Sequence, residues 1–179
     1  IREGKTWFVR GDIRGCFDVL DWGILSAMMR DSLQDARLLR LLNKAIRVPI
    51  VRAGRILCRK NGVPQGSPIS PTLANLYLHP FDTTMSRYGY RLIRYGDDWL
   101  IMLENGEETL TCFETAVDIL AQLKIAINVE KSGIGNLRRA EINFLGHRID
   151  ATGVEAGPKA WEWFSRALKD YKTSQDNTI

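Results

Sequence analysis

The stretch "RLIRYGDDWLIML", residues 91–103, places two adjacent aspartates, Asp97 and Asp98, between two apolar runs that have the composition of strands. Two carboxylates about 4 Å apart repel each other by roughly 1 kcal/mol in water and about 4 kcal/mol at the dielectric of a protein surface. Solvent alone offsets this repulsion at many turns, and that is the commoner case for an isolated pair. A divalent cation offsets it better.

A third carboxylate, Asp12, ends another strand-like run, "KTWFVRGDI" at residues 5–13. If this strand lies beside the hairpin, three carboxylates meet at one edge of a sheet. Hard oxygen ligands of this kind suit Mg²⁺, which also accepts substrate phosphates as ligands. Two such ions about 3.5–4 Å apart clamp the attacking and leaving oxygens of a phosphoryl transfer.

The composition is that of a globular domain, because the 179 residues are 45% hydrophobic and 26% charged. The apolar runs are far shorter than the roughly 20 residues of a membrane span, so we expect no membrane partner. A net charge of +4 is compatible with a polyanion, and the scattered cysteines suggest neither a zinc site nor disulfides. The chain starts with Ile1 and has no apolar signal region, so we expect a piece of a longer protein whose targeting segment could lie outside these residues. The compartment is left open, with an intracellular location expected, cytoplasmic if bacterial.

The remaining patterns alternate helices and strands. Helices are expected from Asp21 as N-cap, from Asp31 or Ser32 to residue 46, from Ser70 as N-cap with Pro71 after it, over 112–123, and from residue 158. A hairpin turning at Ala53–Gly54, a short strand at 124–129 and a strand turning at Gly146 complete the pattern. With an antiparallel hairpin among them, these elements predict a mixed-sheet α+β or α/β layer fold.

Five motifs, between about Trp7 and Ile149, resemble in order the palm motifs of reverse transcriptases. They are "DIRGCFD", "GVPQGSPISPTLANLYLHPFD", "YGDDWLI", "NVEKS" and "FLGH". The sequence is most similar to the group II intron-encoded, maturase-like lineage, which includes CRISPR-associated relatives. The resemblance implies an α+β polymerase palm with an antiparallel sheet backed by helices. Residues 1–149 would form this palm with part of the fingers, and residues 150–179 the start of the thumb connection.

The resemblance also implies catalytic roles. Asp12 and Asp97 correspond to the principal metal ligands, Asp98 to an auxiliary one, and the Ile13 carbonyl would complete a metal shell. The implied cofactor is a pair of Mg²⁺ ions, with Mn²⁺ as a substitute. Lys131 corresponds to a lysine beside the incoming triphosphate, where it would protonate or stabilise the leaving pyrophosphate; a solvated surface charge is an equal alternative.

Nucleotide-binding roles fall on two further motifs. Phe17 matches a steric gate that excludes a ribose 2′-OH and so favours dNTPs, although a core role is the better reading of Phe17 taken alone. RNA-dependent RNA polymerases tend to have a ribose-binding aspartate at this position, whereas here Asp18 comes one residue later. Pro64, Gln65 and Gly66 match the loop that lines the incoming nucleotide and template base; an ordinary turn before a helix is the alternative.

Nucleic-acid contacts are expected from two segments. One is the basic run of Arg52, Arg55, Arg59 and Lys60, which would touch phosphates unless it is only a solvated hairpin face. The other is Phe144-Leu145-Gly146, which resembles the primer-grip turn and could equally be a strand end packed on the core. Two positions depart from the family pattern, because Gly96 stands where Ala is commoner and Trp99 where Phe or Val is expected.

The implied activity is that of an RNA-directed DNA polymerase. It would extend the 3′-OH of a DNA or RNA primer with dNTPs on an RNA template. The alternative is an RNA-binding splicing cofactor, a maturase that keeps the fold without required polymerase activity and binds intron RNA. An RNA-dependent RNA polymerase is disfavoured by Phe17, and a nucleotide cyclase would leave the Pro64–Gly66 loop without a role.

Overall fold

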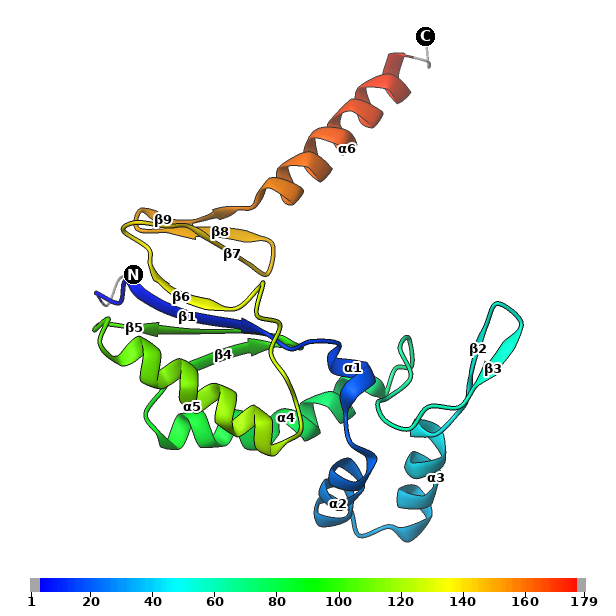
Figure 1. The fold of residues 1–179 in the computed structure, drawn as a ribbon. Helices are drawn as coiled ribbons and strands as arrows, with labels where there is room; N and C mark the ends of the chain where they lie inside the picture. The colour runs from blue at the N-terminus through cyan, green and yellow to red at the C-terminus, as the bar shows by residue number, and fades with distance from the viewer. Residues whose placement is uncertain (1–3, 177–179) are drawn as a thin grey trace.

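The computed structural model describes residues 4–176, in which helices and strands alternate as shown in Figure 1. In chain order the elements are β1 (Trp7–Asp12), α1 (Cys16–Val19), α2 (Trp22–Ser32), α3 (Ala36–Ile46), β2 (Ile50–Arg52), β3 (Arg55–Leu57), α4 (Ser70–Arg87), β4 (Leu92–Tyr95), β5 (Asp98–Leu103), α5 (Glu108–Gln122), β6 (Gly133–Asn136), β7 (Ile142–Phe144), β8 (His147–Asp150), β9 (Gly153–Ala156) and α6 (Pro158–Asp176).

The central sheet has the order β4-β5-β1-β6, and all of its neighbouring strands are antiparallel. The register of β1 on β5 runs from Trp7 opposite Leu103 to Asp12 opposite Asp98. The strand that ends in Asp12 therefore lies beside the hairpin that carries Asp97 and Asp98, which is the condition that the sequence analysis set for a meeting of the three carboxylates.

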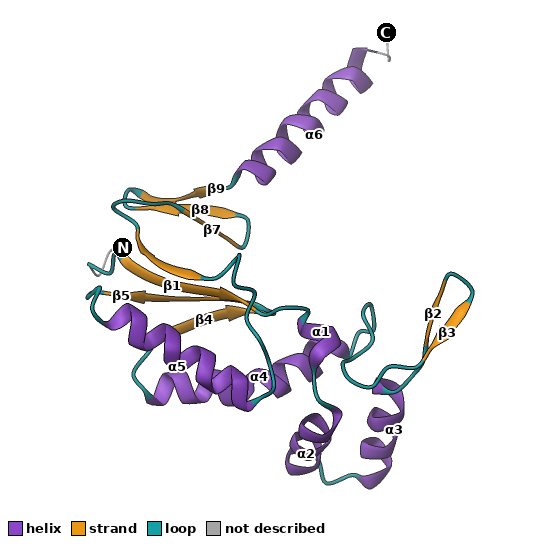
Figure 2. Ribbon diagram, viewed as in Figure 1, coloured by secondary structure: helices purple, strands orange, loops and turns teal. Residues whose placement is uncertain are grey.

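The two faces of this sheet are buried by different layers. Val9 and Ile101 belong to the large core under α4 and α5, which cover one face in Figure 2. Phe8 and Leu100, one residue along each strand, point to the other face and pack with Ile142 of the three-stranded sheet β7-β8-β9. The expected α+β architecture, an antiparallel sheet backed by helices, is confirmed. Among the described helices none is long and apolar enough to cross a membrane.

Trp99 is accommodated by a glycine on the neighbouring strand. Its side chain is fully buried, and its ring meets Phe81 of α4 edge-on with centroids 5.6 Å apart. Gly11 lies directly opposite in the register, and a Cβ atom on Gly11 would overlap the indole ring. The unusual tryptophan after the aspartate pair therefore depends on the glycine before Asp12.

The first two long helices begin at aspartates. The Asp21 carboxylate accepts hydrogen bonds from the backbone N–H groups of Gly23 and Ile24 at 2.8 and 3.0 Å, so the predicted cap of α2 is confirmed. The predicted cap of α3 was wrong. Helix α2 continues through Asp31 and Ser32, and Asp35 caps α3 after a three-residue break.

The start of α4 also differs from the prediction. Ser70 is the first helical residue and Ile69 occupies the cap position, so Ser70 is not the N-cap. The Ser70 hydroxyl instead donates a hydrogen bond to the Pro64 carbonyl. The side chain thus holds the preceding loop on the helix, and Pro71 follows within the first turn as expected.

The short strand expected over residues 124–129 is not formed. Residues 124–129 form only an isolated bridge between Ile13 and Ile127, and the edge strand is β6. Its sequence, Gly-Ile-Gly-Asn, has low strand propensity. Tertiary packing outweighs that propensity, because a Cβ on Gly135 would collide with the Phe8 ring and only glycine lets the strand approach.

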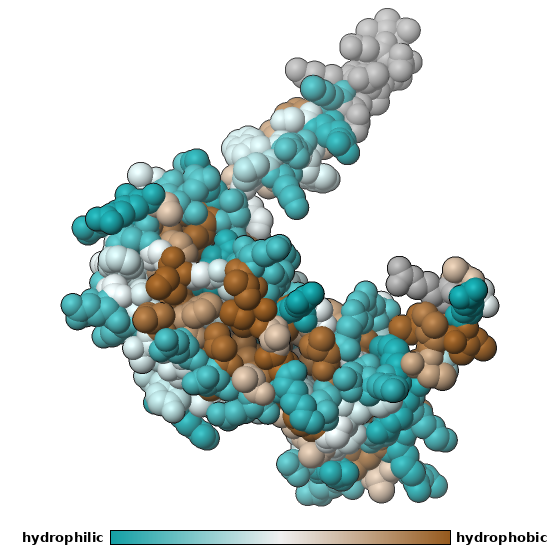
Figure 3. All heavy atoms as spheres, in the orientation of Figure 1, coloured by the Kyte–Doolittle hydropathy of each residue, from teal (hydrophilic) through white to brown (hydrophobic). Residues whose placement is uncertain are grey.

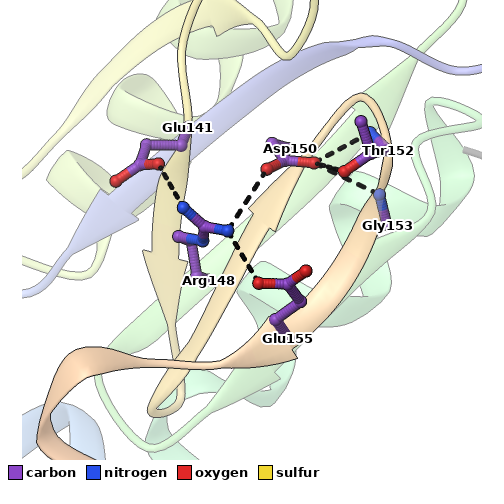
Figure 4. Close-up of polar contacts among 6 residues, drawn as sticks. All are labelled: Glu141, Arg148, Asp150, Thr152, Gly153 and Glu155. Carbon is purple, nitrogen blue, oxygen red and sulfur yellow. Dashed lines mark hydrogen bonds and ion pairs between the residues drawn. The ribbon is translucent and has the colours of Figure 1, made fainter.

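The three-stranded sheet has a polar outer face, drawn in Figure 4. Arg148 of β8 donates hydrogen bonds to Glu155 at 2.7 Å and to Glu141 at 3.4 Å. Asp150 accepts bonds from the Thr152 hydroxyl and the following turn, which lowers its pKa. The strand expected to turn at Gly146 is the hairpin β7–β8, and β9 extends the same sheet beyond residue 150. The domain division at residue 149 stays a prediction.

Candidate active site

Asp12 and Asp98 face each other where β1 ends and β5 begins. Asp97 precedes Asp98 in a two-residue turn, where its carbonyl accepts the Ile13 N–H at 3.1 Å. Gly96, the first turn residue, has a φ of 61°, a conformation that favours glycine. Backbone pairing thus brings the three aspartates and Ile13 to one end of the central sheet.

The charges of the three carboxylates act on one another. Burial raises the pKa of Asp98, and the negative charges of Asp97 and Asp12 raise it further, while Arg10 and Lys131 oppose the rise. Within residues 4–176, however, no three acidic, histidine or cysteine side chains gather closely enough to hold a metal ion by themselves. The predicted convergence is therefore confirmed for the backbone, whereas the side chains do not form a finished metal cage.

Lys131 contacts the most buried of these carboxylates. Its Nζ lies 3.3 Å from Asp12 Oδ1, and the lysine side chain is 60% exposed against 9% for Asp12. The adjacent Ser132 hydroxyl accepts the Asp12 N–H at 3.1 Å, and the Asn128 N–H donates to the Asp12 carbonyl at 2.8 Å. Residues 128–132 therefore contact the end of β1 and place one exposed cation, Lys131, beside the site.

Arg94 links the aspartate turn to α4, a role that the sequence analysis missed. Its guanidinium donates two hydrogen bonds to Asp82 of α4 at 2.7 and 2.6 Å, one to Asn75 at 3.0 Å and one to the Gly96 carbonyl at 2.9 Å. The side chain is only 9% exposed. A signal was present, because strand alternation puts Arg94 on the same face as Leu92, and a half-buried cation needs an acidic partner.

The Pro64–Gly66 loop is docked on α1, next to Phe17. The Val63 N–H donates to the Phe17 carbonyl, and the Gly62 N–H to the Leu20 carbonyl, each at 2.7 Å. Gln65 Nε2 donates to Asp18 at 3.0 Å, which joins the exposed part of the loop to the same helix. The structure thus brings together the two predicted nucleotide-binding segments. Phe17 itself is half-buried against the core, which is compatible with both of its readings.

The predicted phosphate-binding residues do not share one environment. Arg55 and Lys60 are exposed, on and after the β2–β3 hairpin. Arg52 lies opposite Arg55 in the register, but its side chain is outside the described part of the structure. Arg59 is half-buried, and its guanidinium donates to the Ile46 carbonyl at 2.9 Å, so it closes the end of α3.

Phe144-Leu145-Gly146 forms the turn between β7 and β8. Leu145 and Gly146 have φ values of 50° and 78°, the positive angles of a type I′ hairpin turn. Phe144 packs on the second core, while Leu145 remains 43% exposed at the tip. The Gly146 carbonyl accepts the Gly157 N–H at 2.8 Å and so fastens this turn to the start of α6.

Known proteins are similar to this chain in sequence and in fold. A family model described as "Reverse transcriptase (RNA-dependent DNA polymerase)" matches residues 1–149. The chain is 37% identical over 79 residues to the group II intron-encoded protein LtrA of Lactococcus lactis subsp. cremoris, a match covering 44% of this chain and 13% of LtrA. It is 39% identical over 80 residues to an uncharacterized 91 kDa protein in cob intron of Schizosaccharomyces pombe, covering 45% and 10%.

Two solved structures have the same fold. The telomerase of Candida albicans, in complex with a fragment of telomeric RNA, superposes with a TM-score of 0.66 at 16% identity, covering 86% of this chain and 31% of telomerase. A foamy viral protease-reverse transcriptase in complex with an RNA/DNA hybrid gives 0.60 at 18% identity, covering 86% and 18%.

The chain spans only a small part of the length of the curated relatives named above. The family model, in contrast, covers most of the chain and every motif on which the carboxylate site depends. The chain belongs to the reverse transcriptase family.

Proposed function

We propose that this chain is the palm and part of the fingers of an RNA-directed DNA polymerase. The observation that carries the proposal is the register that sets Asp12 against Asp98, with Asp97 at the adjoining turn, in a member of the reverse transcriptase family. Residues 1–149 would form this unit, and β9 with α6 would lead into the thumb.

The aspartate side chains match a divalent metal ion in ligand type and in charge. Members of this family use divalent metal ions, and aspartate oxygens are the ligands that Mg²⁺ prefers. Asp12, Asp97 and Asp98 concentrate negative charge at one point, and the only cation within ion-pair distance of them among the described residues is Lys131 on Asp12. We assign these side chains and the Ile13 carbonyl to two Mg²⁺ ions, with Mn²⁺ as a substitute. When bound, they would activate the attacking hydroxyl and neutralise charge on the phosphates.

The remaining residues would act on the substrates. Lys131 is exposed enough to leave Asp12 and bind the leaving pyrophosphate. Phe17, whose carbonyl accepts the N–H of Val63 just before the Pro64–Gly66 loop, would meet the sugar of the incoming nucleotide and exclude a 2′-OH. The exposed Gln65 would contact the nucleotide or the template base. The Phe144–Gly146 turn would support the primer end.

The partners follow from these roles. The enzyme would take an RNA template, a DNA or RNA primer and dNTPs, and would extend the primer 3′-OH by in-line attack with release of pyrophosphate. The exposed hairpin residues Arg55 and Lys60, with Arg52 beside them in the sequence, would contact the phosphates of the nucleic acid. Arg59 serves the fold instead, through its bond to Ile46.

The test uses the full-length protein that contains this chain. Incorporation of dNTPs and of NTPs is measured on a primed RNA template with Mg²⁺, for the wild type, Asp97→Asn and Asp118→Asn. Asp118 is an exposed aspartate of α5, so its substitution is the same chemical change away from the site.

We expect dNTP incorporation to fall at least about a thousandfold in Asp97→Asn, as when a principal stabilising group is lost, and to persist in Asp118→Asn. A preference for NTPs in the wild type would contradict the role of Phe17. A wild type that binds intron RNA and promotes splicing without incorporating nucleotides would replace the polymerase by the splicing-cofactor alternative.

A further inference from the structure

A groove of about 920 Å³ is lined by residues of α2, of α3 and of the segment just after α3. The two helices lie below the β2–β3 hairpin in Figure 1. The lining of the groove includes four cationic side chains and no acidic one. The cationic residues are Arg30, Arg40, Lys44 and Arg47. Such a groove has no role in the carboxylate site, because it is formed by residues 22–49, which contribute none of the residues assigned above.

The charges follow one line along α3. Arg37, Arg40, Lys44 and Arg47, here called the basic stripe, fall within about 80° of the helix circumference at 100° per residue. From first to last they span about 15 Å along the axis at 1.5 Å per residue. All four are exposed, and within residues 4–176 none of the first three has an acidic side chain at ion-pair distance.

The last residue of the stripe is held in place by its neighbours. The Arg47 guanidinium lies over the Trp22 ring, 5.1 Å from the centroid, and donates hydrogen bonds to the Asn43 carbonyl and side chain at 3.1 and 3.0 Å. Its planar fork is therefore oriented before any ligand arrives, which reduces the ordering cost of binding an anion.

The opposite side of α3 packs against the protein core. Leu39 and Leu42 pack on the main core and Ile46 is fully buried. Two other leucines of the helix, Leu38 and Leu41, are exposed at 39% and 63%. Figure 3 shows a mostly hydrophilic surface over α2 and α3, whereas hydrophobic atoms collect on the neighbouring β2–β3 hairpin. The outer surface of α3 therefore combines the basic stripe with two exposed leucines, and the helix contains no acidic residue.

We propose that the basic stripe and the α2–α3 groove bind the phosphate backbone of a nucleic-acid segment that lies outside the carboxylate site. Guanidinium groups match phosphates with paired hydrogen bonds, and a row of about 15 Å spans several consecutive phosphates of one strand. The choice of nucleic acid as the polyanion depends on the proposed polymerase function, and the surface would add affinity without touching the reacting nucleotide.

The experiment compares two triple variants of the full-length protein. Arg37→Gln/Arg40→Gln/Lys44→Gln removes three charges of the stripe and spares Arg47, whose packing supports the fold; glutamine preserves helix propensity. Arg87→Gln/Arg138→Gln/Arg139→Gln is the control, because it removes the same charge from exposed residues of other elements. Circular dichroism checks that both variants fold. The probes are a fluorescein-labelled RNA hairpin, a DNA hairpin of the same sequence, and vesicles of phosphatidylserine and phosphatidylcholine.

For the stripe variant we expect hairpin affinity at least about tenfold weaker, and a slope of log Kd against log salt that is smaller by about 2–3. The control variant keeps a slope closer to that of the wild type. Equal loss in the two variants would overturn the proposal, since charge alone would then explain binding. Loss of vesicle binding with unchanged hairpin binding would overturn it in favour of a membrane surface.

The two hairpin arms show whether the stripe prefers RNA to DNA, and an equal loss in both supports backbone recognition. Incorporation on a short primer–template at saturating concentration is measured in parallel. Retained incorporation with weakened hairpin binding places the stripe outside the catalytic site. If the wild type incorporates no nucleotides, only the proposed polymerase function is contradicted. The proposal for the basic stripe is tested separately, because the salt dependence of Kd is measured without catalysis.

Discussion

The two hairpins of this chain have similar local structure and opposite surroundings. Both turn through two residues, Gly96-Asp97 in β4–β5 and Ala53-Gly54 in β2–β3. The φ angle is positive at Gly96 in the first turn and at both residues in the second. Strand β5 is paired on its second edge with β1 and buried against α4, whereas β2 and β3 pair only with each other within the described residues. Local sequence is thus enough to form a hairpin, but only tertiary contacts fix where its turn lies.

The largest effect is expected at Arg94, which ties the aspartate turn to α4. Arg94→Met removes four donated hydrogen bonds and leaves the Asp82 carboxylate without its cation. We expect a loss of about 2–4 kcal/mol in unfolding free energy, below the full cost of breaking a buried pair because Asp82 is 33% exposed. Urea denaturation measures the loss.

Two further variants separate positioning from stability. Arg94→Lys keeps the charge but cannot form the fork, so it should recover part of the stability while kcat for dNTP incorporation stays low. Arg87→Met, which changes an exposed arginine at the end of α4, should leave the unfolding free energy within about 0.5 kcal/mol of the wild type. Full activity of Arg94→Lys would show that a positive charge is enough and that the turn does not need the directed hydrogen bonds of the guanidinium.

A smaller loss is expected at Gly11, which lies against the Trp99 ring. Gly11→Ala should cost about 1–3 kcal/mol, because the added methyl group forces the indole or the strand to move. Combining it with Trp99→Phe should restore part of the loss, so that the two changes are not additive. Gly133→Ala is the control, since a Cβ there meets no atom within 4 Å. Additive losses in denaturation experiments would contradict the pairing of Gly11 with Trp99.

What the sequence predicted was the part with strong periodic or motif signals. The apolar runs around Asp97 and before Asp12 were sufficient to predict the strands, whereas the pairing of these strands was implied by the resemblance to reverse transcriptase palms. Burial of one apolar face then fixes the observed register. Strand β6 was missed, since its Gly135 is required by the Phe8 ring, which lies far away in sequence. The link from Arg94 to Asp82 was also missed, because the side chains that Arg94 contacts, Asp82 and Asn75, come from another element, α4. The side-chain geometry of a metal site was beyond any sequence signal.

A pH-dependent effect is expected at Asp98, whose pKa is raised by burial and by Asp97 and Asp12. A raised pKa means that the folded state holds the proton more tightly than the unfolded state. Stability should therefore fall as pH rises from the usual aspartate range through the raised pKa. Asp98→Asn removes this dependence, so above that range and without divalent ions the variant should unfold at a higher temperature than the wild type.

Added Mg²⁺ provides the internal check on Asp98. An ion that binds only the folded wild type stabilises it by mass action, so the difference between the two proteins should shrink. A wild type that is already more stable than Asp98→Asn at neutral pH in the presence of a chelator would show that the mutual repulsion is offset by the protein itself.

The smallest change in stability is expected at the projecting β2–β3 hairpin. Arg55 is exposed there and lies beside Ile56, whose side chain is 72% exposed. Arg55→Gln should leave unfolding free energy within about 0.5 kcal/mol and reduce the salt slope of primer–template binding by about 1. Arg59→Gln is the matched contrast. It removes the bond to the Ile46 carbonyl, so it should cost about 1 kcal/mol and leave the salt slope unchanged. The reverse result would make Arg59 the phosphate contact and Arg55 a solvated charge. Since the two arginines are four residues apart in one basic run, such a reversal would also show that a bond to a helix end does not keep a guanidinium from nucleic acid.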